Sequence, residues 1–170
     1  MRLSGRFGHA CKFAGVVLFA LAIAACSKPG TPRQFGLGGE GPINPGTARD
    51  FSVNVGDVVH FTVDSTALTG EAQNILRGQA RWLNRYPSYA VTIEGHADER
   101  GTREYNLALG ARRATSVRSF LTNQGVSAAR MRTISYGKER PVAVCDEVSC
   151  WTQNRRAQTV LTNRAVARNY

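Results

Sequence analysis

Hydrophobic positions between residues 51 and 162 follow two spacings, and each spacing predicts one kind of secondary structure. Segments in which apolar residues run together or alternate with polar ones indicate strands. Segments in which they recur every three or four residues indicate helices. The predicted strands are 58–63, 89–95, 131–136 and one that includes 158–161, and the predicted helices are about 70–86 and 103–124.

Residues at the helix ends support these boundaries. Thr69 and Thr102 stand at the N-cap positions, where a hydroxyl oxygen can accept a hydrogen bond from a free backbone N–H. Pro87 ends the first helix, and Gly125 follows the second as a C-terminal stop. The predicted buried stripes are Ala72, Ile75, Leu76, Gln79/Ala80 and Leu83 in the first helix, and Leu107, Ala111, Ala114, Val117 and Leu121 in the second.

This order of elements predicts an α+β fold. Strand–helix–strand units have right-handed crossovers, so both helices are expected on one face of the sheet. A loop over 137–154 should separate the third strand from the last. The expected architecture is a β-α-β-α-β-β two-layer sandwich with a mixed sheet, occupying residues 51–162.

The N-terminal 25 residues are typical of a secretory signal. Arg2, Arg6 and Lys12 precede an uncharged apolar run, 13–25, whose 13 residues are too few to span a bilayer. The alternative, a buried N-terminal helix, does not explain the basic flank. The run ends Ile23-Ala24-Ala25-Cys26, which resembles the lipobox of bacterial lipoproteins, so Cys26 is the expected site of lipidation. An ordinary cleaved signal with an incidental cysteine is the alternative.

Composition assigns the remaining segments and the charge of the exported chain. Residues 26–50 are rich in Gly and Pro and predict a flexible linker behind the lipid anchor, and 163–170 form a basic tail. Without the three basic residues of the signal, 19 Lys and Arg stand against 12 Asp and Glu, a net charge of +7. Such a charge favours polyanions. The export signal argues for cell-wall polymers or anionic lipids and against nucleic acid.

Cys145 and Cys150 remain in the mature chain, separated by four residues. In an oxidising compartment such a pair can close a disulfide. A zinc site is the alternative, but two thiols without a nearby histidine supply only half of a tetrahedral site. Two free thiols are the remaining alternative.

Four motifs in order give this chain a family resemblance over about residues 51–162. They are GHADERGT (95–102), Asn106-x2-Leu109-x3-Arg113-Ala114, SYGKERP (135–141) and Asn154-Arg155-Arg156. Together they resemble the OmpA-like peptidoglycan-binding domain family, and the spelling GHADERGTREYN resembles its lipoprotein branch. The resemblance implies the OmpA-like version of the fold described above.

In that family the domain binds the meso-diaminopimelate of peptidoglycan stem peptides. The resemblance implies that Asp98 takes the ammonium group and Arg113 the carboxylate of that residue. Phe61, Asp64, Asn106 and Arg156 are implied as further peptidoglycan-binding residues, with Arg155 solvated. Thr62 stands where the family often has an acid.

The chemistry of Asp98 and Arg113 supports this assignment independently. A carboxylate after a strand can accept from an ammonium, and a guanidinium can hold a carboxylate with two parallel hydrogen bonds. The alternative is that Asp98 and Arg113 only pair with each other. We expect Asp98→Ala and Arg113→Ala each to abolish most binding to sacculi while leaving the fold intact.

The resemblance also implies a location and partners. Ser27 after the lipidated cysteine resembles lipoproteins sent to the outer membrane, with the domain facing the periplasm. The family links outer membrane to wall within the Tol system of envelope integrity and cell division, with the propeller protein TolB as partner. A generic OmpA-like lipoprotein without Tol contacts is the nearest alternative, and a cell-wall hydrolase the one from another class.

No cofactor and no enzymatic activity are expected. No Ser/His/Asp set, nucleophile elbow or phosphate loop occurs in the sequence. Glu94, His96 and Asp98 alternate along an extended segment, so a metal is conceivable, although such a histidine is more often a hydrogen-bonded spacer.

Overall fold

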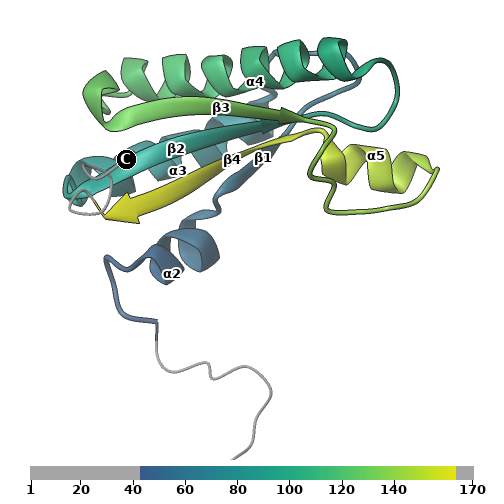
Figure 1. The fold of residues 1–170 in the computed structure, drawn as a ribbon. Helices are drawn as coiled ribbons and strands as arrows, with labels where there is room; N and C mark the ends of the chain where they lie inside the picture. Colours follow the sequence, from purple (N-terminus) through teal and green to yellow (C-terminus); the bar gives the residue numbers. More distant parts are fainter. Residues whose placement is uncertain (1–42, 164–170) are drawn as a thin grey trace, which may run out of the picture. The chain divides into compact units, whose positions relative to one another are not determined.

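The computed structural model describes residues 43–163, so the signal sequence, Cys26 and the basic tail lie outside the described residues. Four strands and two long helices form the body of the domain (Figure 1). In chain order the elements are α2 (Ala48–Asp50), η1 (Phe51–Val55), β1 (Val58–His60), α3 (Gly70–Arg85), β2 (Tyr89–His96), α4 (Arg103–Asn123), η2 (Ala128–Arg130), β3 (Met131–Gly137), α5 (Val148–Asn154) and β4 (Arg156–Asn163).

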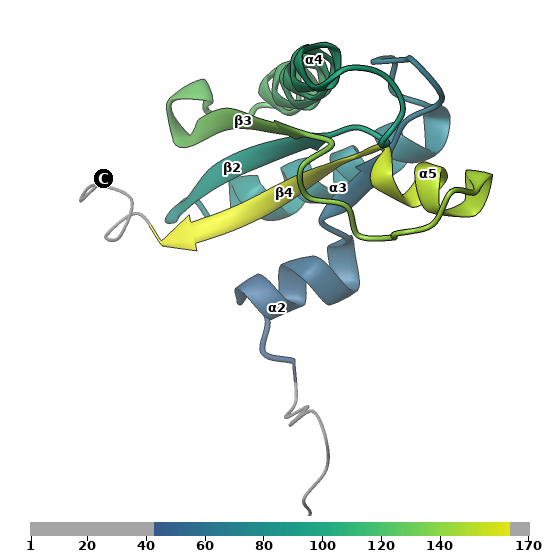
Figure 2. The ribbon, with the colours of Figure 1, turned by 45° about the vertical axis from the view of Figure 1, so that its right-hand side comes forward.

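The sheet has the order β1-β4-β2-β3 and is mixed. β4 pairs antiparallel with both β1 and β2, and β2 pairs in parallel with β3. β2 is therefore central, and its last residues lie beside the start of β4, since Gly95 pairs with Ala157. Both long helices cover one face of the sheet (Figure 2), which confirms the predicted α+β class and layer order.

The long helices begin where their caps were predicted. The hydroxyl oxygens of Thr69 and Thr102 accept hydrogen bonds from the backbone N–H groups of Ala72 and Tyr105. The hydrophobic core lies between the helices and the sheet. Its largest fully buried apolar side chains are Phe51, Leu76, Leu83, Ile93 and Leu121.

Helix α4 approaches the sheet closely because two glycines face each other. A Cβ added at Gly95 of β2 would lie 1.9 Å from the carbonyl oxygen of Gly110 of α4. This contact sets the face that α4 buries, and the predicted stripe is wrong at two positions. Leu107 and Ala111 are exposed, whereas Leu109, Gly110 and Arg113 are buried.

Three segments differ from the sequence-based expectation. β1 ends at His60, because the Arg155 N–H that would continue the pairing donates to Trp151 of α5 instead, and the chain then turns after Phe61. The loop over 137–154 contains helix α5. The folded part also begins before Phe51, since α2 lies in the predicted linker and the Gly46 carbonyl accepts from the Tyr89 hydroxyl at 3.0 Å.

Within residues 43–163, none of the helices combines the length and the apolar character that crossing a membrane requires.

Candidate functional site

A cavity of about 240 Å³ lies at the end of β2. The loop after β2 forms one side of it, the first turns of α4 form another, and the segment after β1 completes the rim. These elements meet because β2 leads directly through the loop into α4 and because Arg113 bonds to the segment after β1. Its lining residues are Val63, Asp64, Asp98, Arg100, Gly101, Tyr105, Asn106, Leu109 and Arg113.

Asp98 is the buried carboxylate of this cavity. It forms ion pairs with Arg100 at 2.9 Å and with Arg155 at 3.1 Å. Burial alone would raise the pKa of Asp98, but the hydrogen bonds from Arg100 and Arg155 outweigh it and the pKa lies below its usual value. Asp98 is therefore a fixed anion at neutral pH.

Arg113 is fully buried, and its guanidinium is held by three backbone carbonyl groups. Nε donates to Ser65 at 2.9 Å, Nη1 to His96 at 2.8 Å and Nη2 to Thr62 at 3.1 Å. Burial lowers the pKa of Arg113 to about 10, so the group remains cationic at neutral pH. A guanidinium has five N–H donors, and two of them are not used in these bonds.

The hydrogen-bond partners of Asp98 and Arg113 exclude the alternative that these two side chains only pair with each other. Asp98 bonds to Arg100 and Arg155, and Arg113 bonds to backbone carbonyls, so the two side chains are not each other's main partners. Both line the same cavity. The site therefore offers an anion and a cation that face one small space.

Asp64 and Tyr105 form the exposed rim. Asp64 has a positive φ of 51°, which brings its carboxylate to the Tyr105 hydroxyl, and this hydroxyl donates a hydrogen bond to it. That bond raises the pKa of Tyr105. Asn106 is buried beneath the rim, lines the cavity and donates to the Arg100 carbonyl at 2.7 Å. Asn106 thus holds the loop on the helix.

Two of the predicted site residues are not among those that line the cavity. Phe61 is a core residue, and the Arg113 guanidinium lies 5.1 Å from its ring centroid, so Phe61 supports the site from beneath. Arg156 donates to the Arg140 carbonyl at 3.2 Å. The expectation of a solvated Arg155 is wrong, since this side chain is buried and reaches Asp98.

Sequence reasoning missed the roles of Arg100, Arg155 and Tyr105. Arg100 and Tyr105 lie inside the GHADERGTREYN motif, and the proximity of Arg100 to Asp98 was a usable signal. Arg155 had no such signal. Its contact with Asp98 spans 57 residues and depends on the pairing of β4 with β2.

A disulfide joins Cys145 and Cys150 in the structure. Close to it, the Asn154 side chain binds the loop, accepting from the N–H groups of Val142 and Ala143. The Arg100 guanidinium lies over the Trp151 ring, with its Cζ atom 4.2 Å from the ring centroid. The lobe of residues 141–154 therefore supports the arginines that surround Asp98.

His96 is buried on β2, and its two ring nitrogens have no hydrogen-bond partner within the described part of the chain. Its Nε2 lies 3.9 Å from a Glu94 oxygen. Burial lowers the pKa of His96 to about 4, aided by the positive charges of Arg156 and Arg140. Between residues 43 and 163, no group of three or more His, Cys, Asp or Glu is placed to hold a metal ion.

Comparison with known proteins places this geometry in a family. The model of the OmpA family matches residues 60–161. A peptidoglycan-associated lipoprotein of Agrobacterium fabrum is 62% identical over 146 residues, which cover 84% of this chain and 82% of that protein. One of Pseudomonas aeruginosa is 39% identical over 162 residues, covering 86% of this chain and 94% of the relative.

Solved structures agree with these sequence relatives. The peptidoglycan-associated lipoprotein of Burkholderia pseudomallei is 43% identical, with a TM-score of 0.61 over 62% of this chain and 90% of that chain. The C-terminal domain of Helicobacter pylori MotB is 22% identical, with a TM-score of 0.60 over 66% and 89%, and shares the fold. The chain belongs to the OmpA family, in its group of peptidoglycan-associated lipoproteins.

Proposed function

We propose that this chain is an outer-membrane lipoprotein whose periplasmic domain binds peptidoglycan non-covalently and so links the membrane to the cell wall. The observation that carries the proposal is the pair of buried opposite charges, Asp98 and Arg113, at one cavity of about 240 Å³. The names of the relatives, which describe association with peptidoglycan, support it.

The ligand we propose is the amino-acid head at the end of the diaminopimelate side chain. Its carboxylate would accept from the two unused N–H groups of Arg113, and Arg100, whose side chain is 43% exposed, could swing to join them. Its ammonium would donate to Asp98, with the exposed carboxylate of Asp64 nearby at the rim. Charge-assisted hydrogen bonds of this kind are the strong ones, and both ends of the ligand head would be satisfied.

A pull-down with purified sacculi tests this site. Asp98→Asn keeps the shape of the side chain and removes its charge. Losing one partner of a desolvated charged contact costs about 2–5 kcal/mol, so we expect binding to fall by about 30-fold or more. Asp146→Asn, an exposed acid on the α5 lobe, is the matched control and should bind like the unsubstituted protein. Equal binding by the two variants would exclude Asp98 from the site.

Lipid attachment at Cys26 and contact with TolB belong to the same proposal. The motif Ile23-Ala24-Ala25-Cys26 and the lipoprotein names of the relatives support the first. Family resemblance supports the second and, with it, a role in the Tol–Pal system of cell division. A pull-down with TolB separates this role from that of a generic envelope lipoprotein, which would retain sacculus binding and fail to retain TolB.

A further inference from the structure

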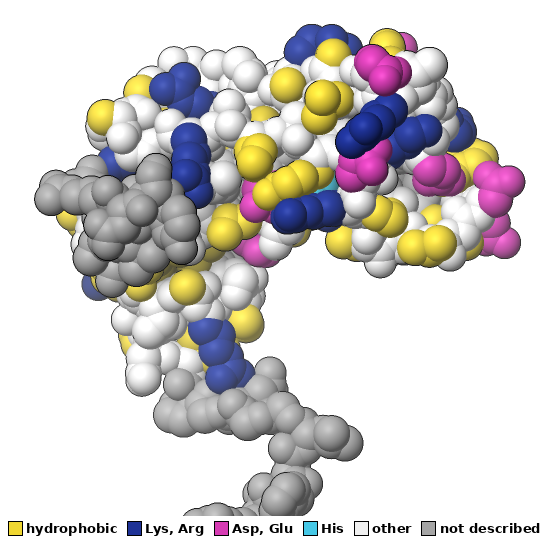
Figure 3. All heavy atoms as spheres, in the orientation of Figure 1, with side chains coloured by type: hydrophobic (Ala, Val, Ile, Leu, Met, Phe, Trp, Pro, Cys, Tyr) yellow, Lys and Arg dark blue, Asp and Glu magenta, His cyan; other side chains and the backbone are white. Residues whose placement is uncertain are grey.

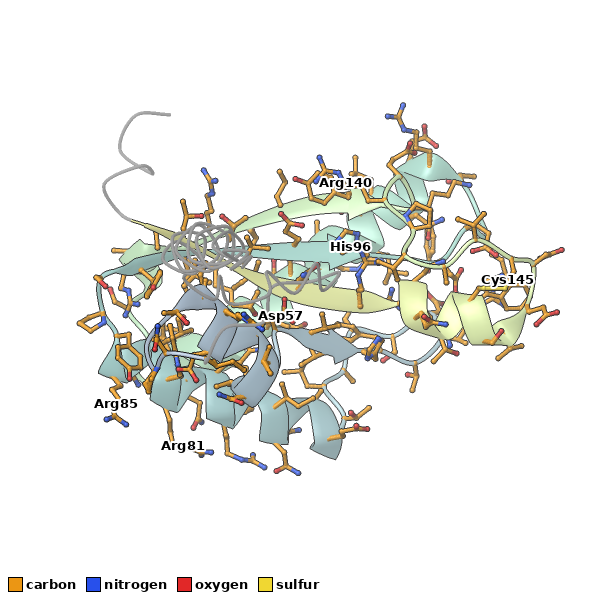
Figure 4. The ribbon with its side chains drawn as sticks, turned by 90° about the horizontal axis from the view of Figure 1, so that it is seen from below. Asp57, Arg81, Arg85, His96, Arg140 and Cys145 are labelled. Carbon is orange, nitrogen blue, oxygen red and sulfur yellow. A yellow bond between two sulfur atoms is a disulfide. The ribbon has the colours of Figure 1, made fainter. Side chains whose placement is uncertain are left out.

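A groove of about 750 Å³ lies between helix α3 and residues 45–55, at the end of the domain where the chain enters. Two exposed arginines of α3, Arg81 and Arg85, line it (Figure 4). Arg77 lies one turn earlier on the same face, since residues four apart are neighbours on a helix. Its guanidinium donates to the nearby Asn74 side chain. The α3 face thus presents three arginines at successive turns.

Arg77, Arg81 and Arg85 take part in none of the ion pairs found among residues 43–163, which involve other basic side chains. Their positive charges can therefore attract an external anion. The acidic residue in the groove lining is Asp50, whose oxygens accept from Trp82 Nε1, Asn54 Nδ2 and the Gly46 N–H, each at 2.8 Å. With Arg77 beside it, the groove carries a net positive charge. An arginine guanidinium can bind a phosphate group with two parallel hydrogen bonds.

The groove and the Asp98 cavity lie at opposite ends of the sheet. Arg85 ends α3 four residues before β2 begins, and Asp98 follows the end of β2. The eight residues of β2 span about 26 Å at 3.3 Å per residue. Tyr89, at the groove end, donates to the carbonyl of Gly46, so the chain from the predicted lipid anchor enters here. Figure 4 shows Arg81 and Arg85 at one end and Cys145, in the lobe beside the cavity, at the other.

The length of the linker places a membrane within reach of this groove. Nineteen residues separate Cys26 from Gly46. A flexible coil of this length spans about 25 Å on average and at most about 70 Å. The opposite end carries acidic side chains among its arginines, at Glu99, Glu139, Asp146 and Glu147, and Figure 3 shows acidic groups gathered at that end. An anionic surface would therefore attract the groove end first.

We infer that the arginine groove of α3 binds the phosphate groups of anionic phospholipids in the membrane to which the chain is anchored, and so orients the domain with its Asp98 cavity toward the wall. The inference rests on the proposed lipid-anchored function. Electrostatic attraction acts over a Debye length of about 8 Å at physiological salt. The groove therefore binds only when the domain lies against the membrane surface.

Vesicle sedimentation tests this inference on the mature chain carrying Cys26→Ser, which removes binding through the acyl chains. The protein should sediment with phosphatidylglycerol vesicles at low salt, remain in solution with phosphatidylcholine vesicles, and dissociate as salt rises. Each basic residue near an anionic surface contributes about a fivefold factor to partitioning. Arg81→Gln/Arg85→Gln should therefore lower the partition coefficient about 25-fold.

The matched control has the same change of net charge elsewhere. Arg103→Gln/Arg112→Gln alters two exposed arginines of α4, the helix whose first turns line the Asp98 cavity, and should retain most vesicle binding. Equal losses in the two double variants, or absence of binding by the parent chain, would overturn the inference. Sacculus binding of the same variants is measured in parallel. Loss of sacculus binding by Arg81→Gln/Arg85→Gln, with vesicle binding intact, would assign the groove to the wall instead. Failure of the parent chain to bind sacculi would count against the proposed function alone.

Discussion

Arg113→Ala should unfold the domain at a lower temperature rather than simply remove a ligand contact. The structure changes the sequence-based expectation of an intact fold, because the guanidinium joins the segment after β1 to the end of β2. Its three acceptors, Thr62, Ser65 and His96, lie on two separate stretches of chain. Removing the side chain leaves these carbonyls without their donor and exposes the ring of Phe61.

The size of the effect follows from the burial of each bond. A hydrogen bond to a charged group contributes about 1.5–3 kcal/mol. The bond to His96 is buried, and we assign it about 2 kcal/mol. The bonds to Ser65 and Thr62 are partly buried, so water can replace them in part, and about 1 kcal/mol each is reasonable. The sum, about 4 kcal/mol, is a large share of the 5–15 kcal/mol typical of a domain.

Urea denaturation followed by circular dichroism measures this loss, with the free energy of unfolding extrapolated to water. At roughly 4 °C per kcal/mol, the melting temperature should fall by about 15 °C. Arg112→Ala is the matched control, since Arg112 immediately precedes Arg113 in the helix and is exposed, and its effect should stay within about 0.5 kcal/mol. A change below about 1 kcal/mol in Arg113→Ala would refute the view that Arg113 joins the two segments.

Three further predictions follow from the described residues and the sequence. The pKa of His96 is about 4 in the folded state against 6.5 for an ordinary histidine, so the unfolded chain binds the extra proton first. The free energy of unfolding should therefore fall by about 3 kcal/mol between pH 6.5 and pH 4, and His96→Leu should flatten this part of the pH–stability curve. Reduction of the Cys145–Cys150 disulfide should lower the free energy of unfolding by about 2 kcal/mol and leave sacculus binding nearly unchanged. A large loss of binding on reduction would instead make the lobe part of the site. Mass spectrometry of the exported protein should find Cys26 as an acylated N-terminus, and an unmodified peptide that begins elsewhere would contradict lipidation.

Local patterns in the sequence were sufficient for the long elements. Thr69 and Thr102 fix where α3 and α4 begin, because capping depends on residues within one turn. Gly95 and Gly110 show where local patterns fail. The depth of α4 on the sheet depends on both glycines, and an amphipathic period cannot reveal a contact between two elements. Leu107 was therefore predicted on the buried face, whereas Arg113 occupies it.

In the site, too, local sequence patterns predict some residues and miss contacts between distant elements. Asp98 and Arg113 were predicted to share a cavity, and the structure places both on its lining. The contact of Arg155 with Asp98 could not be read from spacing, because β4 reaches the end of β2 only through the order β1-β4-β2-β3. Helix α5 was also missed. Its N-cap residue, Glu147, makes no side-chain cap hydrogen bond, and the disulfide joins Cys150 inside the helix to Cys145 before it.

The direction of the strands has a mechanical consequence. The chain enters beside Tyr89 at one end of β2, and the cavity lies beyond His96 at the other end. A tension between membrane and wall would therefore run parallel to the strands. The backbone hydrogen bonds between β1 and β4, and between β4 and β2, lie across that direction. Under such a force the bonds of a strand pair are loaded together and must break together. The domain should therefore resist tension along its strands.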